Sequence, residues 1–382
     1  MIIEKIDLFK VPPRWLFVRI TTKSGYVGWG EPLLEGKTDS VAAVVRDIEE
    51  YIIGKDATRI EDIFICLTRG GFYRPGPILM SAVSGIEQAL WDIKGKKLNV
   101  PVYDLLGGRV RDQILMYGWV GGDNAEDAIT NARERINMGF KAIKSNLVGK
   151  SEWILSRKEV TEILNYFRKL RAEVGEETGI AIDFHGRIHR NMAKIIVKEL
   201  EEIQPLFYEE PLLPEYSHLL KEVSAYTSIP IASGERLIGR REFKDLIGNA
   251  AVSIIQPDLS HVGGIWEARK ISANAEMYDM AVAPHCPLGP IALASSLQLN
   301  ACTPNAIILE SSSGIHYNES IDLTDYLINK EDFKIEDGYI KLSSRPGLGI
   351  EMDEKVVTEM AKKGHNWRNP IWRGKDGSFV EW

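Results

Sequence analysis

Cysteine is scarce in this chain of 382 residues, which contains three, at Cys66, Cys286 and Cys302. Three scattered thiols are too few for a disulfide framework or for a zinc site built from paired cysteines. We therefore expect a protein of a reducing compartment, and the cytoplasm fits this cysteine content best.

Long apolar runs and an excess of basic residues are also missing. No apolar run approaches the ~20 residues that cross a bilayer, and residues 1–15 lack the basic start and apolar core of a secretory signal. The 54 acidic residues outnumber the 47 basic ones, which gives a net charge of −7 without a basic block. Binding to nucleic acid or to an anionic membrane is therefore not expected. The 44% hydrophobic and 26% charged residues are typical of a globular protein, and the length suggests an enzyme.

A strand and helix alternation begins near residue 113. Eight short β-rich runs alternate with longer helical patterns: ILMYGWV, FKAIKSN, GIAIDFHG, PLFYEEP, IPIASGE, VSIIQPD, MAVAPHC and AIILESS. Such alternation predicts a parallel sheet, and eight units over ~200 residues predict a closed α/β barrel of the (β/α)8 type. An open doubly wound sheet is the alternative, disfavoured because no G-x-G-x-x-G follows the first run.

The segments on either side of this repeat read differently. Residues 1–112 predict an α+β unit, with three β-rich runs, helical patterns over 41–53 and 80–98, and a Gly- and Pro-rich loop at 70–77. Residues 321–382 are irregular and rich in tryptophan near the end. We expect them to pack back on the first unit, with the tryptophans as packing anchors. The predicted division is therefore 1–112, 113–320 for the barrel, and 321–382.

Polar residues end six successive β-rich runs, at spacings of 23 to 27 residues. They are Asp183, Glu209, Glu235, Asp258, His285 and Glu310. Residues at the carboxyl ends of barrel strands share one mouth, where barrel active sites lie. Helix capping is the alternative for any one of them, but it suits aspartate and not glutamate or histidine.

The first three of these residues predict a metal site. Asp183, Glu209 and Glu235 come from consecutive strands, with no thiol or imidazole among them. Carboxylate oxygens suit a hard cation such as Mg²⁺, which keeps further positions for water or substrate. Glu210 should point to the opposite face, because side chains alternate along a strand.

Histidines predict the acid and base chemistry. His185 follows Asp183 by two residues, so a continuous strand would bring both side chains to the mouth. Asp258 and His285 end neighbouring strands, and a carboxylate beside an imidazole raises its basicity. His261 and His316 lie just past strand ends and could line the pocket.

This residue set suits removal of a proton next to a carboxylate. A metal that holds the substrate carboxylate would stabilise the enediolate formed when His285 takes the α-proton. His185 could then protonate a leaving β-hydroxyl, and Glu310 could hydrogen-bond the enediolate. The predicted reaction is dehydration of a 2,3-dihydroxy acid to a 2-keto-3-deoxy acid.

Five motifs carry a resemblance that covers nearly the whole chain. They are Asp183-Phe184-His185-Gly186-Arg187, Tyr208-Glu209-Glu210-Pro211, Ser233-Gly234-Glu235-Arg236, Gln256-Pro257-Asp258-Leu259-Ser260-His261 and Ala283-Pro284-His285-Cys286-Pro287-Leu288-Gly289-Pro290. With them the chain resembles the mandelate racemase subgroup of the enolase superfamily. Tyr73-Arg74, the segment 89–96 and the tail motif Trp367-Arg368-Asn369-Pro370 also match.

The resemblance implies a modified (β/α)7β barrel, capped by an α+β domain that both chain ends form. It implies one Mg²⁺ on Asp183, Glu209 and Glu235, and a homo-oligomer, often an octamer in the family. The capping domain should supply specificity through loops near 12–15 and 72–77. Arg14, Tyr73 and Arg74 are then candidate substrate contacts.

The same resemblance assigns the chemistry residue by residue. His285, paired with Asp258, would take the C2 proton, His185 would expel the C3 hydroxyl, and Glu310 would stabilise the enediolate. Racemases of the subgroup carry Lys-x-Lys at the second strand, whereas this chain has Lys144-Ser145-Asn146. Because Asn146 cannot accept a carbon-bound proton, a two-base racemase is disfavoured, and Asn146 becomes a candidate substrate contact.

The resemblance implies a small aldonate as the substrate, with galactonate as the first choice. Gluconate, arabinonate and fuconate are the alternatives, because sugar stereochemistry depends on a few hydrogen bonds that the sequence does not reveal. A non-catalytic barrel that senses sugar acids is an alternative of another class. A sensor would need neither His185 nor the Asp258–His285 pair, which argues against it.

Overall fold

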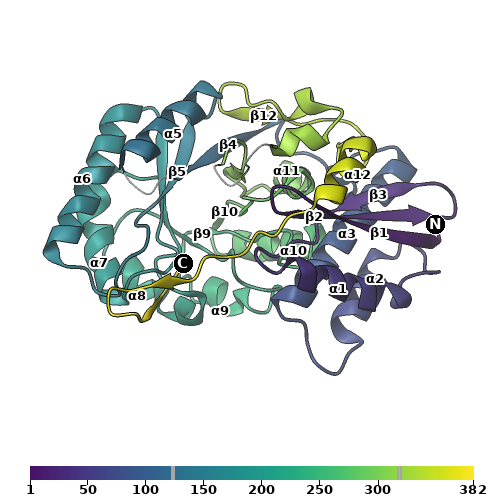
Figure 1. Cartoon of the computed structure of the whole chain (residues 1–382), viewed down its shortest axis with the longest axis horizontal. Helices are drawn as coiled ribbons and strands as arrows, with labels where there is room; N and C mark the ends of the chain where they lie inside the picture. Colours follow the sequence, from purple (N-terminus) through teal and green to yellow (C-terminus); the bar gives the residue numbers. More distant parts are fainter. Residues whose placement is uncertain (122–124, 316–317, 319–320) are drawn as a thin grey trace.

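The computed structural model describes residues 1–121, 125–315, 318 and 321–382. A barrel occupies one side of the molecule, and a smaller α+β unit lies beside it (Figure 1). None of the helices in these ranges is long and apolar enough for a membrane span.

The α+β unit begins with a sheet of order β1-β2-β3, formed by β1 (Ile3–Val11), β2 (Trp15–Thr22) and β3 (Val27–Gly30). The helices α1 (Thr38–Ile48), α2 (Ile60–Arg69), α3 (Pro77–Leu98) and α4 (Val102–Leu105) follow. The sheet packs on α3 at its third strand, where backbone meets backbone. A Cβ atom on Gly30 would lie 1.8 Å from the Gly85 oxygen of α3, so this approach requires glycine.

The eight β-rich runs all form strands of one parallel sheet in the described residues. They are β4 (Gln113–Val120), β5 (Ala142–Asn146), β6 (Gly179–Asp183), β7 (Phe207–Glu209), β8 (Ile231–Ser233), β9 (Ile254–Ile255), β10 (Ala281–Val282) and β11 (Leu309–Ser311). Their order is β10-β9-β8-β7-β6-β5-β4-β11. An isolated parallel bridge joins Val282 of β10 to Ala306, three residues before β11, and so brings the two end strands of this order together and closes the barrel.

Helices connect each strand to the next. They are α5 (Ala125–Asn137), α6 (Arg157–Val174), α7 (Arg190–Glu199), α8 (Leu220–Ser224), α9 (Phe243–Gly248), α10 (Ile265–Glu276) and α11 (Pro290–Cys302). Within the described ranges this is the predicted (β/α)7β arrangement, in which no α-helix follows β11 directly. The amphipathic α6 begins with a capping box, in which Ser156 and Glu159 bind each other's backbone N–H groups.

A layer of small and large side chains fills the inside of the barrel. One residue from each strand or its flank contributes: Tyr117, Ala142, Ala181, Phe207, Ala232, Ile254, Ala283 and Ile308. The rings of Tyr117 and Phe207 meet edge to face at 6.0 Å. The barrel therefore has a packed floor, above which the carboxyl ends of the strands are free to hold polar groups.

Two buried carboxylates of the α+β unit bind the starts of barrel helices. Glu31, directly after β3, accepts hydrogen bonds from the Gly289 and Ala292 N–H groups at the start of α11, at 2.7 and 3.0 Å. Glu87 of α3 accepts from the first two N–H groups of α10, at 2.8 and 2.9 Å. The carboxyl oxygens accept hydrogen bonds from N–H groups that have no partner within the helix, so these contacts dock the two parts.

The last segment contacts both parts. β12 (Tyr339–Lys341) pairs antiparallel with β4, whereas α12 (Glu354–Lys363) packs on β1. An ion pair of 2.7 Å joins Arg19 of β2 to Glu354 of α12. Beyond α12 the chain crosses to the barrel side and forms the hairpin β13 (Trp372–Arg373) and β14 (Phe379–Val380) (Figure 1). The predicted boundaries at residues 112 and 320 stay a prediction.

Candidate active site

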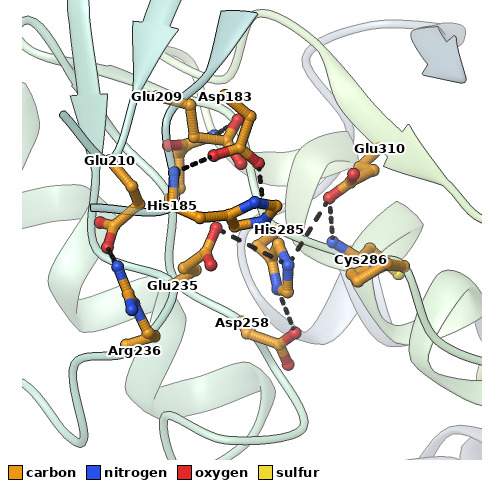
Figure 2. Close-up of polar contacts among 12 residues, drawn as sticks. Asp183, His185, Glu209, Glu210, Glu235, Arg236, Asp258, His285, Cys286 and Glu310 are labelled. Atoms are coloured by element: carbon orange, nitrogen blue, oxygen red, sulfur yellow. Dashed lines mark hydrogen bonds and ion pairs between the residues drawn. The ribbon is translucent and has the colours of Figure 1, made fainter. Parts of the chain in front are cut away.

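Three buried carboxylates converge at the mouth of the barrel (Figure 2). Asp183 and Glu209 are the last residues of β6 and β7 and pair directly in the sheet, and Glu235 lies two residues after β8. Each contributes an oxygen, and these oxygens lie within 4.8 Å of one another. The predicted metal-ligating residues are therefore together in space.

The chemistry of this cluster suits a hard divalent cation. Asp183 Oδ2 and Glu235 Oε2 are buried, and among the described residues neither forms a regular hydrogen bond, although charged side chains lie within ion-pair distance of both. Burial, together with the neighbouring carboxylates, raises the pKa of Glu209 well above its usual range. Buried oxygens of this kind are the ligands that Mg²⁺ and Ca²⁺ prefer.

Lys144 of β5 lies within the carboxylate cluster, and the sequence reasoning gave it no role in the site. Its Nζ contacts Glu209 and lies 2.9 Å from Glu310 Oε1 and 3.4 Å from Asp183 Oδ2. Burial disfavours the ammonium, but the carboxylates outweigh it and raise the pKa of Lys144 well above its usual range. A lysine within the buried run FKAIKSN was the available signal, because an unpaired charge is rarely buried.

His185 reaches the mouth by a different route from the predicted one. The strand β6 ends at Asp183, and His185 has φ of +49°, so the alternation of a strand does not place its side chain. Its backbone N–H donates to Asp183 Oδ1 at 2.9 Å, and its Nε2 lies 3.1 Å from Asp183 Oδ2. Burial lowers the pKa of the imidazole to about 3.

His285 and Asp258 form the predicted pair. His285 Nδ1 lies 2.8 Å from Asp258 Oδ2, and its Nε2 lies 3.7 Å from Glu235 Oε2 (Figure 2). Asp258 is held in turn by the Ser260 N–H at 2.7 Å. Burial disfavours the imidazolium, but Glu235 and Asp258 outweigh it and raise the pKa of His285 well above its usual range.

Glu310 and Glu210 face different surroundings. Glu310 of β11 accepts a hydrogen bond from the Cys286 N–H at 3.0 Å, and its Oε2 lies 4.0 Å from His285 Nε2. Glu210 turns away from the three-carboxylate cluster and pairs with Arg236 at 2.7 Å (Figure 2). The predicted opposite orientation of Glu210 is therefore what the structure shows.

A cavity of about 460 Å³ lies over these groups. Predicted residues in its wall are Arg14, Asn146, His185, Glu235, His285 and Glu310, together with His261. Asn146 is the last residue of β5, and its Oδ1 accepts a hydrogen bond from the indole of Trp119 at 3.4 Å. A volume of this order suits a small organic ligand.

Most of the loop at 70–77 lies away from the cavity, although we expected this loop to contact substrate. Tyr73 is 86% exposed, and Arg74 donates to the carbonyl of Arg69, the last residue of α2, at 3.0 Å. From this segment Pro77 lines the cavity. Tyr73 and Arg74 do not line the cavity here, because a local pattern does not fix which way a loop faces, and their contact with substrate stays a prediction. His316 lies outside the described residues.

A polar chain joins the α+β unit to the His285–Asp258 pair. Arg14 lies 3.2 Å from Glu35, and Glu35 lies 3.5 Å from His261 Nε2. His261 also lies 3.7 Å from Asp258 Oδ2, and Ser81 hydrogen-bonds its Nδ1 at 3.1 Å. Glu35 was missed in the sequence, because nothing in its neighbourhood marks it as reaching the barrel.

Other wall residues that the sequence reasoning missed come from the end of the chain. They are Trp367, Asn369 and Trp382. The sequence reasoning treated these tryptophans as packing anchors. Their place in the wall depends on the path that the chain takes after α12, which local pattern does not encode.

Two family matches agree with this architecture. Residues 12–107 match the mandelate racemase / muconate lactonizing enzyme N-terminal domain, and residues 127–356 match the enolase C-terminal domain-like family. The chain therefore belongs to the mandelate racemase / muconate lactonizing enzyme group of the enolase superfamily.

Particular relatives are similar over their whole length. The D-galactonate dehydratase of Pectobacterium atrosepticum is 50% identical over 382 residues, which is 100% of both chains. The D-galactonate dehydratase of Cronobacter sakazakii is 48% identical with the same coverage. Among solved structures, an enolase from Agrobacterium radiobacter with bound sodium and L-malate has a TM-score of 0.90 at 33% identity, with 100% of both chains covered.

Proposed function

We propose that this protein is a D-galactonate dehydratase, which converts D-galactonate to 2-dehydro-3-deoxy-D-galactonate and water. The observation that carries the proposal is the position of two imidazoles at the carboxylate cluster. His185 lies beside Asp183, whereas His285 lies beside Glu235. A base and an acid at one metal site suit removal of a C2 proton and a C3 hydroxyl. The two D-galactonate dehydratases described above support the choice of substrate.

Asp183, Glu209 and Glu235 are the residues that would hold Mg²⁺. When bound, the cation supplies positive charge that stabilises the enediolate oxygens and offsets Glu235, which lowers the pKa of His285 toward neutrality. Lys144 lies beside Asp183 and Glu209 and 2.9 Å from Glu310, so protein charges of both signs would lie near a substrate carboxylate bound at this cluster.

Two side chains, His285 and His185, carry out the proton transfers. Asp258 accepts the Nδ1–H of His285, so that Nε2 faces the cavity as the base that takes the C2 proton. The C3–O bond breaks as His185 donates its proton, and the hydroxyl leaves as water. Burial lowers the pKa of His185 to about 3, so this role requires that the negative charge of the bound substrate raise it until the imidazole carries a proton. The enol product becomes the 2-keto acid by taking a proton at C3.

Turnover tests this proposal directly. The purified protein with Mg²⁺ should produce a 2-keto acid from D-galactonate, detected as its semicarbazone. We expect kcat/KM for D-galactonate to exceed that for D-gluconate by about tenfold or more, since polar sites discriminate epimers strongly. Faster turnover of gluconate would contradict the assignment of D-galactonate as the substrate and leave the mechanism intact. No turnover of any aldonate would contradict the assignment of the protein as an aldonate dehydratase.

A separate experiment tests which metal the protein uses. Protein treated with EDTA should lose activity, and added Mg²⁺ should restore it better than Ca²⁺, because Mg²⁺ holds the more rigid geometry. Restoration by Ca²⁺ alone would contradict the assignment of Mg²⁺.

We also infer a homo-oligomer, because oligomers, often octamers, are usual in the family, and a cytoplasmic location, because the chain has three scattered cysteines. Light scattering after size-exclusion chromatography measures the mass directly. A monomer of 42.9 kDa at working concentration would contradict this inference.

A further inference from the structure

The segment after α12 crosses the mouth of the barrel. In Figure 1 this yellow segment runs from α12, beside the α+β unit, to the barrel side, where the chain end is marked. Three of its residues, Trp367, Asn369 and Trp382, line the cavity over the carboxylates and histidines. The wall of the active site therefore includes residues that are far in sequence from every metal-site residue.

Contacts with the α+β unit hold the first part of this segment. The Arg14 guanidinium lies 5.6 Å from the centre of the Trp367 ring, within the range of a cation–π contact. Asn369 lies directly against Gly36, where a Cβ atom would meet Asn369 Oδ1 at 2.0 Å. The position of Asn369 thus depends on a glycine at 36, which also has φ of +71°.

Contacts with the barrel hold the second part. The Arg187 guanidinium lies 5.0 Å from the centre of the Trp372 ring in β13. The Trp382 ring returns to Trp367, with their centres 6.0 Å apart. Because both ends of the crossing are attached, the two indoles and the Asn369 amide form a defined wall.

The two ends of a sugar acid in this cavity would contact different kinds of protein group. The carboxylate cluster and the two histidines act on C1, C2 and C3. The remaining hydroxylated carbons must then lie against other parts of the wall. An amide can donate and accept hydrogen bonds with hydroxyl groups, and indole faces pack against the C–H faces of a polyol.

We propose that Trp367, Asn369 and Trp382 form the subsite for C4 to C6 of the sugar acid and set the preferred chain length. This inference rests on the proposed function. It assigns specificity at the far end of the substrate to the tail of the chain as well as to the loops of the α+β unit.

A series of matched acids tests the subsite. D-Galactonate, L-arabinonate and L-threonate share their configuration at C2 and C3 and differ by successive loss of C6 and C5. For Asn369→Ala and Trp382→Ala, kcat/KM for D-galactonate should fall about tenfold or more, because contacts with the remote part of a substrate contribute to kcat/KM. The inhibition constant of L-threonate should change less than about twofold, since its chain ends at C4, where the subsite begins, and lacks C5 and C6.

Phe379→Ala is the matched control, because Phe379 lies in the same tail and is 55% exposed. It should leave both constants unchanged. Equal weakening of D-galactonate and L-threonate would overturn the inference, since it would mean that the tail supports the whole site. Unchanged kcat/KM in both variants would overturn it as well. Failure of the wild type to dehydrate D-galactonate would instead overturn the proposed function and this inference with it.

Discussion

Lys144 balances the charge of the carboxylates in this site. Asp183, Glu209 and Glu310 all lie within ion-pair distance of its ammonium, which is buried at 2% exposure. Removing one partner of a buried ionic network costs more than the pair contributes, because the remaining charges stay unpaired. Lys144 and the proposed Mg²⁺ should therefore substitute for each other in part as sources of positive charge.

Lys144→Met tests this compensation. In EDTA the free energy of unfolding should fall by about 3–5 kcal/mol, because buried carboxylates lose their cation. With excess Mg²⁺ the loss should be smaller. Urea denaturation under both conditions measures the difference, with Lys158→Met as the control, since Lys158 is 85% exposed. Equal losses with and without Mg²⁺ would contradict compensation.

The two histidines can be separated by isotope exchange. His285→Asn should abolish exchange of the C2 proton of D-galactonate with solvent deuterium, with a loss of about 10²–10⁴-fold. His185→Asn should lose the 2-keto product by a similar factor but keep the exchange, because Asp258 still holds the base. Proton NMR in D₂O follows both. Exchange at the wild-type rate in the His285 variant would contradict its role as base.

At the level of elements, the contact between β3 and α3 positions the α+β unit on the barrel. β3 approaches the helix closely at Gly28 and Gly30, and Glu31 follows at once to bind the start of α11. A side chain at this contact would separate the strand from the helix and pull Glu31 from its donors.

Gly30→Ala should therefore lower the free energy of unfolding by about 1–3 kcal/mol or more, as overpacking does. Gly248→Ala is the matched control, because a Cβ atom there would meet nothing within 4 Å. Urea denaturation compares the two variants. A Gly30 variant as stable as the wild type would show that the strand and helix can move apart without cost.

On the scale of the whole molecule, Glu31 and Glu87 link stability to pH. Burial raises the pKa of each carboxyl to about 7, from an ordinary value of 4.5. The folded protein therefore keeps protons that the unfolded chain releases in this range. The contribution of these two protonated carboxyls to the free energy of unfolding is fully present below pH 4.5 and is lost as the pH rises through 7.

Glu87→Gln should remove one such proton. The free energy of unfolding should then decrease less steeply with pH between pH 5 and 7. The slope of the variant should differ from that of the wild type by about 1.4 kcal/mol per pH unit. Denaturation at several pH values gives the slope, whatever the absolute stability of the variant. Glu162→Gln, at an exposed position, should leave the slope unchanged. An unchanged slope in the Glu87 variant would contradict the raised pKa.

Comparison of the structure with the sequence-based predictions shows which features of the site the local sequence pattern determines. The convergence of Asp183, Glu209 and Glu235 and the Asp258–His285 pair were predictable, because a repeat of constant length brings equivalent residues to one end of a barrel. His185 was predicted near them from strand alternation, although a residue with positive φ places it. The sites that were missed, Lys144 and the tail tryptophans, depend on partners that only the folded chain brings close.

The position of β4 has a consequence for how the chain is made. β4 is the first barrel strand to leave the ribosome, yet its neighbours include β11 and β12, which are synthesised after all the other barrel strands. Until they arrive, one edge of β4 is open to wrong partners, and unpaired edges invite aggregation. The barrel therefore cannot close during most of translation, and we expect a nascent chain that ends before residue 309 to depend on chaperones.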